Sequence, residues 1–127
     1  MLKGINIKTI PHELQRYPTC GDWYYSRDNV WQIRVSKMSD WRYEFLVAFH
    51  EILEMAWCHW QGVPQKDCDA FDIEYEKNRP KGDVSEPGDS PAAPYYFGHQ
   101  VATVAERIAA LTLGVDWAVY TKEVESL

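Results

Sequence analysis

The chain has 127 residues, of which 46% are hydrophobic and 14% are aromatic. This is enough for one hydrophobic core and too short for two independent ones, so we expect a single domain over residues 1–127. The formal net charge of −6 argues against a nucleic-acid partner, because binding to phosphate backbones relies on clustered Lys and Arg. No apolar run approaches the roughly 18 residues of a membrane span, and the first residues lack the apolar stretch of a signal peptide. We therefore expect a cytoplasmic protein without a membrane partner.

Residues 1–37 are rich in β-strand patterns. Residues 22–26 and 30–35 contain aromatic and β-branched side chains in partial alternation with polar ones, and residues 27–29 between them have the composition of a turn. These features predict an antiparallel hairpin. A third strand is indicated by a short alternation nearer the N-terminus, at Ile5, Ile7 and Ile10.

The clearest helix spans residues 41–61, within the segment 39–62. Ser39 or Asp40 can cap its N-terminus, and Gly62 follows its last residue. Its apolar residues gather on one broad face when each residue advances by about 100°. They are Phe45, Leu46, Ala48, Phe49, Ile52, Leu53, Ala56, Trp57 and Trp60. We expect this face to pack on the core, with His50 and Glu54 at its edge.

Three segments follow this central helix. Residues 64–78 have a second, shorter amphipathic pattern, whose carboxylates we expect to form a solvated face. Residues 79–94 are rich in Pro, Gly, Asp and Ser and form a long loop, a feature that is often functional in a compact domain. Residues 95–124 contain the C-terminal helices. The carboxylates of the first segment are Asp67, Asp69, Asp72, Glu74 and Glu76.

The first C-terminal helix carries polar residues opposite most of its apolar ones. His99 and Glu106 lie seven residues apart and therefore share one face. The apolar set is Phe97, Val101, Val104, Ala105, Ile108, Leu111 and Leu113. If this apolar set packs on the core, His99 points outward unless the first helical turn borders a cleft.

Residues 50–54, with the sequence His-Glu-Ile-Leu-Glu, are the most chemically specific part of the chain. They resemble the zincin motif HExxH, in which two zinc ligands lie one helical turn apart and the glutamate between them activates the metal-bound water. Glu54 stands where zincins have the second histidine. Because carboxylates also bind zinc, we expect His50 and Glu54 to be metal ligands and Glu51 to be the catalytic base.

His99 is the expected third ligand, because it follows the long loop at the start of a helix. Two histidines and one carboxylate, with a water in the remaining position, describe a catalytic zinc site. In a closed site, Asp89 or Glu86 from the loop would be the fourth ligand. Such a set also describes iron(II) oxygenases. The helical placement and the adjacent Glu51 favour Zn²⁺, with iron, manganese or another divalent metal as the alternative. The expected reaction is attack of the activated water on an amide or ester carbonyl, with Tyr95 or Tyr96 supporting the oxyanion.

Five short segments resemble a family of small uncharacterised proteins from bacteriophages and prophages. They are Val47–Glu54, Asp69–Asp72, Glu86–Asp89, Pro94–His99 (Pro-Tyr-x-x-x-His) and Gly114–Trp117. The resemblance covers roughly residues 45 to 118. It implies phage or prophage origin and a location in the cytoplasm of the host cell, and it implies no activity. The likeness to zincins is confined to residues 50–54.

Three interpretations of these residues agree with the observations. The first is a small zinc-dependent hydrolase that uses Glu51. The second is a non-catalytic metal-binding or helical protein that interacts with a host protein. In the third, His50, Glu54, His99 and Glu106 form an interhelical hydrogen-bond network without a metal. In every case the expected fold is α+β, with a small N-terminal antiparallel hairpin or sheet packed against three or four helices around the central 41–61 helix.

Overall fold

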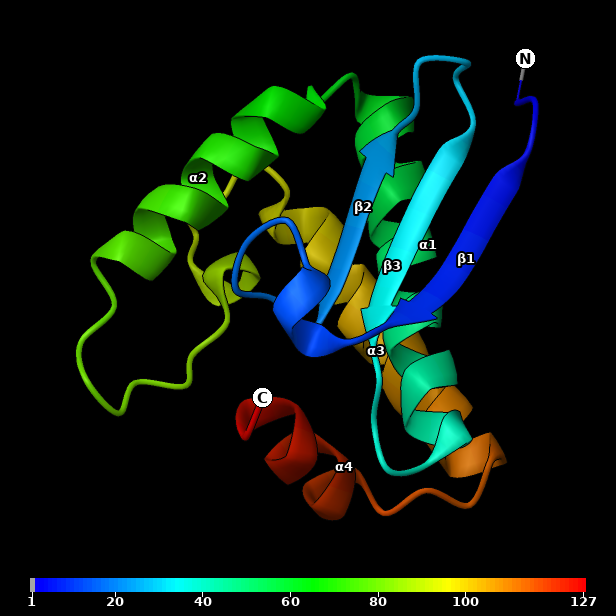
Figure 1. Ribbon diagram of the computed structural model, residues 1–127, viewed down its shortest axis with the longest axis vertical. Coiled ribbons are helices and arrows are strands. Elements are labelled where there is room, and N and C mark those ends of the chain that lie inside the picture. Colours follow the sequence, from blue (N-terminus) through cyan, green and yellow to red (C-terminus); the bar gives the residue numbers. More distant parts are fainter. Residues whose placement is uncertain (1) are drawn as a thin grey trace.

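The N-terminal part of the computed structural model, which describes residues 2–127, is a three-stranded sheet (Figure 1). Its strands are β1 (Ile5–Ile10), β2 (Gly21–Tyr25) and β3 (Trp31–Ser36), in the order β1-β3-β2. β2 and β3 pair antiparallel, and in the turn between them Asn29 adopts the left-handed φ of 58° that asparagine tolerates. The predicted hairpin is confirmed.

The third strand is also present, and it pairs parallel to β3, with Ile7 opposite Ile33. A parallel pair needs a crossover connection. Here the chain after β1 forms a short 3-10 helix, η1 (His12–Leu14), and reaches the far edge of the sheet, where β2 begins. The central strand therefore has a partner on each side, and its Ile33 and Val35 are buried in the core.

Four α-helices follow the sheet: α1 (Trp41–Gln61), α2 (Gln65–Lys77), α3 (Tyr96–Thr112) and α4 (Trp117–Glu125). The loop between α2 and α3 contains a second 3-10 turn, η2 (Pro87–Asp89). This arrangement is the α+β fold that the sequence predicts. In the part of the chain that the structure describes, no helix has both the length and the hydrophobicity needed to cross a membrane.

The bounds of α1 follow from its two end residues. The carboxylate of Asp40 accepts a hydrogen bond from the backbone N–H of Arg42 at 2.9 Å, which satisfies one of the free donors of the first turn. Gly62 ends the helix in the left-handed conformation, with φ of 72°, which glycine adopts without steric cost. The predicted span of 41–61 is confirmed.

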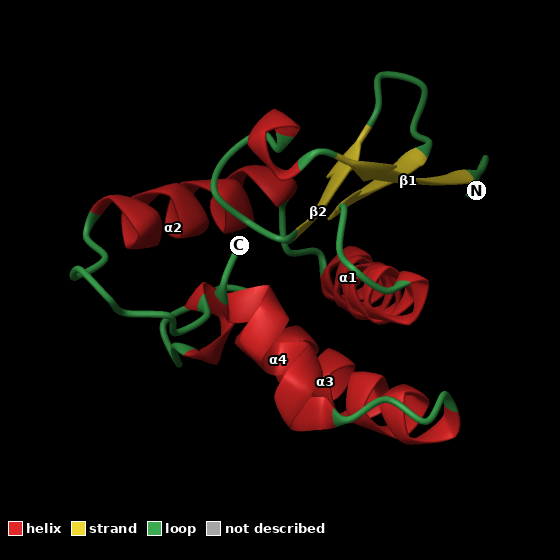
Figure 2. Ribbon diagram, turned by 60° about the horizontal axis from the view of Figure 1, so that its bottom comes forward, coloured by secondary structure: helices red, strands yellow, loops and turns green. Residues whose placement is uncertain are grey.

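The sheet, α1 and α3 form three successive layers, with α1 in the middle (Figure 2). Because α1 has a neighbour on each side, its buried residues cover more than one face. They are Tyr43, Leu46, Val47, Ala48, His50, Glu54, Met55 and Cys58. The single apolar face predicted for this helix is therefore wrong in part. Phe45 and Trp60 are exposed, whereas His50 and Glu54 are buried.

α3 has the opposite orientation from the one its apolar pattern predicts. Its buried residues are Gly98, His99, Ala102, Glu106 and Ala110, whereas its large apolar residues are exposed: Phe97, Val101, Val104, Ile108 and Leu111. The expectation that this apolar set packs on the core is wrong for these five residues, and His99 points inward. Leu113 is partly buried and packs against the core as expected. Small residues allow α3 to lie close to α1, and its polar residues find partners there.

Candidate metal centre

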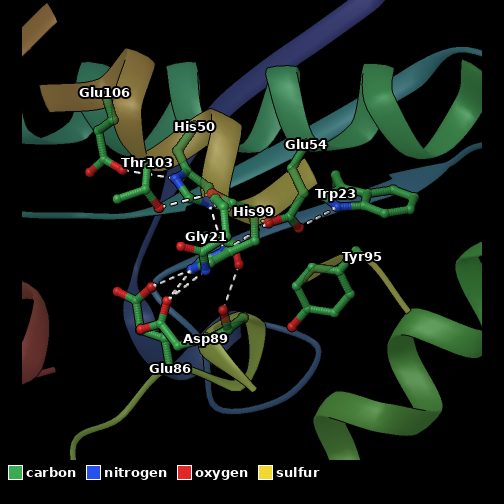
Figure 3. A network of polar contacts seen from close by, with 12 residues as sticks. Gly21, Trp23, His50, Glu54, Glu86, Asp89, Tyr95, His99, Thr103 and Glu106 are labelled. Atoms are coloured by element: carbon green, nitrogen blue, oxygen red, sulfur yellow. Dashed lines mark hydrogen bonds and ion pairs between the residues drawn. The ribbon is translucent and has the colours of Figure 1, made fainter. Parts of the chain in front are cut away.

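His50, Glu54 and His99 come together between α1 and α3 (Figure 3). His50 Nε2 lies 3.2 Å from Glu54 Oε2 and 3.1 Å from His99 Nδ1. The third side of the triangle, from His99 Nδ1 to Glu54 Oε2, measures 3.0 Å. The ligands of a tetrahedral zinc ion with bonds of about 2.0–2.1 Å are roughly 3.4 Å apart. The three atoms thus have nearly the spacing of a zinc ligand set.

Local features of the two helices make this meeting possible. His50 and Glu54 are four residues apart on α1, so their side chains project to the same side. On α3, Gly98 lies directly against the ring of Trp57, because a Cβ atom at Gly98 would be 2.7 Å from Trp57 Cε3. This close approach brings His99, the next residue, within reach of both α1 side chains.

The unused polar atom of each α1 ligand has a partner of its own. The Nδ1 of His50 lies 2.8 Å from Glu106 Oε1, and the hydroxyl of Tyr120 donates to Glu106 Oε2 at 2.6 Å. The indole N–H of Trp23 donates to Glu54 Oε1 at 3.0 Å. These contacts leave His50 Nε2 and Glu54 Oε2 to face each other. A carboxylate on the far nitrogen of a ligand histidine is the usual means of fixing its tautomer and ring orientation in metal sites.

His99 is held from its other side by the loop before α3. Its Nε2 lies 3.0 Å from Glu86 Oε2 and 3.3 Å from Asp89 Oδ1. Gly88, in η2, lies against the imidazole, since a Cβ atom there would be 2.4 Å from His99 Cγ. The loop thus forms one wall of the site, as its position in the sequence suggests. Asp89 belongs with Glu86 and His99 Nε2 to a second cluster, across the ring from His50 and Glu54.

The protonation of the triangle follows from its burial and its partners. Burial opposes ionisation of Glu54, but hydrogen bonds from His50 and His99 outweigh it and lower the pKa of the Glu54 carboxyl to about 2. Burial likewise opposes the charge on His99, yet its contacts with Glu54 and Glu86 raise the pKa of that imidazole to about 10. The pKa of His50 is also raised well above its ordinary value, because contacts with Glu106 and Glu54 outweigh burial. Metal binding at this triangle would therefore displace protons from the histidines.

Glu51 lies beside the triangle and lines a cavity of about 880 Å³ together with His50 and His99. Its side chain reaches the backbone of Gly21, where a Cβ atom would be 2.8 Å from Glu51 Oε1. Burial, reinforced by the charge of Glu54, raises the pKa of Glu51 well above its ordinary value. A raised pKa brings a carboxyl closer to the neutral range in which general bases work best.

Asp72 of α2 lines the same cavity. It accepts a hydrogen bond from the hydroxyl of Tyr17 at 2.9 Å and another from the hydroxyl of Tyr95. Burial raises the pKa of Asp72 to about 7. The expectation of a solvated acidic face is therefore wrong for this residue. Tyr95, one of the two tyrosines expected to support an oxyanion, directs its hydroxyl at Asp72, and Tyr96 is half-buried at the start of α3.

Sequence reasoning missed Trp23 and Tyr120 as parts of this site. Both come from elements remote from the motif, a strand and the last helix, and their spacing to His50 carries no periodic signal. The one available clue is chemical, because a buried indole or phenol needs a hydrogen-bond partner.

No protein-family model, curated protein or solved structure matched the chain.

Proposed function

We propose that this protein is a zinc-dependent hydrolase. His50 Nε2, Glu54 Oε2 and His99 Nδ1 would hold the ion and leave one position open to water. The observation that carries the proposal is the convergence of these three buried atoms within 3.2 Å of one another. Three protein ligands and an open position are typical of catalytic zinc sites, whereas structural zinc sites use four.

The bound metal would act as a Lewis acid and lower the pKa of its water to about 7. Glu51, which lines the same cavity as His50 and His99, would serve as the base that accepts a proton from water and returns it to the leaving group. The chemistry that the metal would supply is the hydrolysis of an amide or ester bond. Glu106 and Trp23 keep the two α1 ligands in place through their contacts with His50 and Glu54.

The resemblance to proteins of phages and prophages supports phage origin and a place in the host cytoplasm as part of this proposal. The alternative is a non-catalytic metal-binding or helical protein that interacts with a host protein, in which the same residues hold α1 to α3 with or without a metal. Its support is that His50, Glu54, Glu106 and Tyr120 are already linked by hydrogen bonds. The two functions differ in whether the site turns over a substrate, and the metal-free form of the alternative differs also in metal uptake.

Metal content separates these functions first. Elemental analysis by mass spectrometry, on untagged protein reconstituted with zinc and dialysed, should give close to one zinc per chain. The double variant His50→Ala/Glu54→Ala should give none. Absence of zinc from the wild-type protein after reconstitution would end the hydrolase proposal and leave the polar helix pair.

Turnover tests the role of Glu51. On a panel of fluorogenic amide and ester substrates, Glu51→Gln should retain zinc and lose turnover by a factor of about 10² to 10⁴, the usual contribution of general acid–base catalysis. The matched control is Glu125→Gln, which removes another carboxylate from the wall of the same cavity and should leave turnover unchanged. Equal turnover in Glu51→Gln and wild type would remove the proposed base.

A further inference from the structure

α3 presents a row of large apolar side chains to solvent. This row, called here the outer stripe, consists of Phe97, Val101, Val104, Ile108 and Leu111, which are 60% to 82% exposed. Their spacings are four, three, four and three residues, the repeat with which helices pair in coiled coils. α3 is also the outermost of the three layers (Figure 2). The exposed fractions show that, within residues 2–127, the outer stripe is not covered by another part of the chain.

The outer stripe is large for a monomer. Five side chains at these exposures amount to an apolar surface on the order of 600 Å², at the upper end of the largest patch that a typical monomer shows. Burying the stripe on two copies would remove roughly 1,200 Å² from solvent, where specific protein interfaces begin. The N-terminal end of α1, with the exposed Trp41 and Phe45, adds apolar surface near one end of the stripe, because Arg42 donates to the carbonyl of Leu113 at 3.2 Å.

The charges around the outer stripe favour a second copy over a different helical partner. Coiled-coil partners are usually selected by charged residues that flank the apolar seam. Over Tyr96–Thr112, the side chains of His99 and Glu106 are buried and Arg107 is the one exposed charged residue. The net charge of −6 is thus carried by other parts of the chain. Two copies can bring these stripes together with little charge repulsion.

We propose that the outer stripe is a homodimer interface, in which α3 packs antiparallel against α3 of a second copy about a two-fold axis near Val104. Phe97 and Leu111 lie seven residues to either side of Val104, so an antiparallel pair places each opposite the other across the interface. A parallel pair would bring the two Arg107 side chains to the same level. The antiparallel pair separates them by about 9 Å along the helix axis, at 1.5 Å per residue.

Sedimentation equilibrium at micromolar concentrations tests the interface. Wild-type protein should be dimeric, and Val104→Glu/Ile108→Glu should be monomeric with an unchanged circular dichroism spectrum, since both side chains are exposed. The matched control is Ile73→Glu/Val119→Glu, which charges exposed apolar residues of α2 and α4 and should remain dimeric. A monomeric wild type, or a stripe variant that stays dimeric, would overturn the proposal. The first of these outcomes would assign the stripe to a different partner.

Disulfide trapping tests the orientation. Under mild oxidation, Val104→Cys should cross-link to itself, because it lies on the axis, and Phe97→Cys should cross-link to Leu111→Cys only when the two variants are mixed. The native cysteines interfere little, because none of them is exposed. Self-cross-linking of Phe97→Cys would overturn the antiparallel arrangement, and failure of Val104→Cys to cross-link would overturn the position of the axis. Ile73→Cys, on α2, is the background control and should give no dimer band.

Discussion

The two faces of α3 differ in the opposite sense from those of an ordinary surface helix, which buries its apolar stripe and exposes its polar side. The inner face buries His99 and Glu106 against α1, and the outer face exposes the five residues of the outer stripe. The polar groups of the inner face have partners within the chain, because His99 contacts Glu54, and Glu106 contacts His50 and Tyr120. The outer face is exposed, and apolar surface of this size usually marks an interface. The inner face is therefore satisfied by the fold itself and is the place of the proposed metal centre, whereas the outer face is the place of the proposed dimer interface.

The largest loss of stability should come from removing a buried carboxylate that the inner face of α3 contacts. Glu54→Ala removes a carboxylate that contacts His50, His99 and Trp23, so buried polar groups lose their shared partner. In metal-free protein we expect a loss of about 3–5 kcal/mol in the free energy of unfolding, the cost of breaking a buried ion pair. Urea denaturation in the presence of a chelator measures it.

The outer face supplies the contrast for that experiment. Val101→Ala, measured in protein dilute enough to be monomeric, should change the free energy of unfolding by no more than about 0.5 kcal/mol, because Val101 is mostly exposed. Similar losses in Glu54→Ala and Val101→Ala would show that the inner face contributes no more to the free energy of unfolding than the outer face.

The next effect concerns the loop that holds His99. Gly88→Ala puts a Cβ atom where only 2.4 Å separates it from the imidazole, so either His99 or η2 must move. Displacing a ligand histidine and its carboxylate partners should weaken zinc binding by about 10- to 100-fold, as measured by competition with a chromophoric chelator. Gly4→Ala is the control, because its added Cβ atom meets Val30 at an ordinary 3.8 Å. Unchanged zinc affinity in Gly88→Ala would show that η2 does not position the ligand.

A smaller effect is expected from the residue behind Glu106. Tyr120→Phe removes the hydroxyl that donates to Glu106 Oε2 and leaves the ring in place. The freed carboxylate should orient His50 less firmly, and zinc affinity should fall by about 10-fold, with a loss of about 1 kcal/mol in stability. Tyr96→Phe, on α3 itself, removes a hydroxyl from a half-buried ring and should change neither quantity. If both variants behave alike, the contact between Tyr120 and Glu106 has no role in positioning His50.

The sequence was sufficient where the signal is local. The hairpin follows from a turn between two β-rich runs, and α1 follows from Asp40 and Gly62 at its ends. The proximity of His50 and Glu54 follows from their spacing of one helical turn. The contribution of His99 was inferred from its position after the loop, and the structure brings it to the α1 pair.

The sequence was insufficient to predict how elements that are distant along the chain pack against each other. The apolar pattern of α3 predicts a buried stripe, and that rule fails here because α1 offers His50 and Glu54 as partners for the polar side of α3. The parallel pairing of β1 and the contacts of Trp23 and Tyr120 likewise depend on long-range packing, which leaves no periodic trace in the sequence. Asp72 illustrates the same limit, because its acidic neighbours on α2 suggest solvent whereas Tyr17 and Tyr95 enclose it.

A test of pH dependence separates this buried carboxyl from the metal centre. Burial raises the pKa of Asp72 from 3.8 to about 7 in the folded protein, while the unfolded chain keeps a value near 3.9. Between about pH 4 and pH 7 the folded state therefore holds the extra proton, so this group's contribution to stability falls as pH rises through that window. Asp72→Asn cannot ionise and should lose this slope, becoming more stable relative to wild type between pH 5 and pH 8. Urea denaturation of metal-free protein across that range measures the difference.

The comparison with wild type removes the contribution of other titrating groups, because His50, His99 and Glu51 are present in both proteins. Asp67→Asn, an exposed carboxyl on the same helix, should give a curve parallel to wild type. A parallel curve for Asp72→Asn as well would mean that Asp72 is ionised in the folded protein throughout this range. The hydroxyls of Tyr17 and Tyr95 would then be sufficient to stabilise the charge of this buried carboxylate.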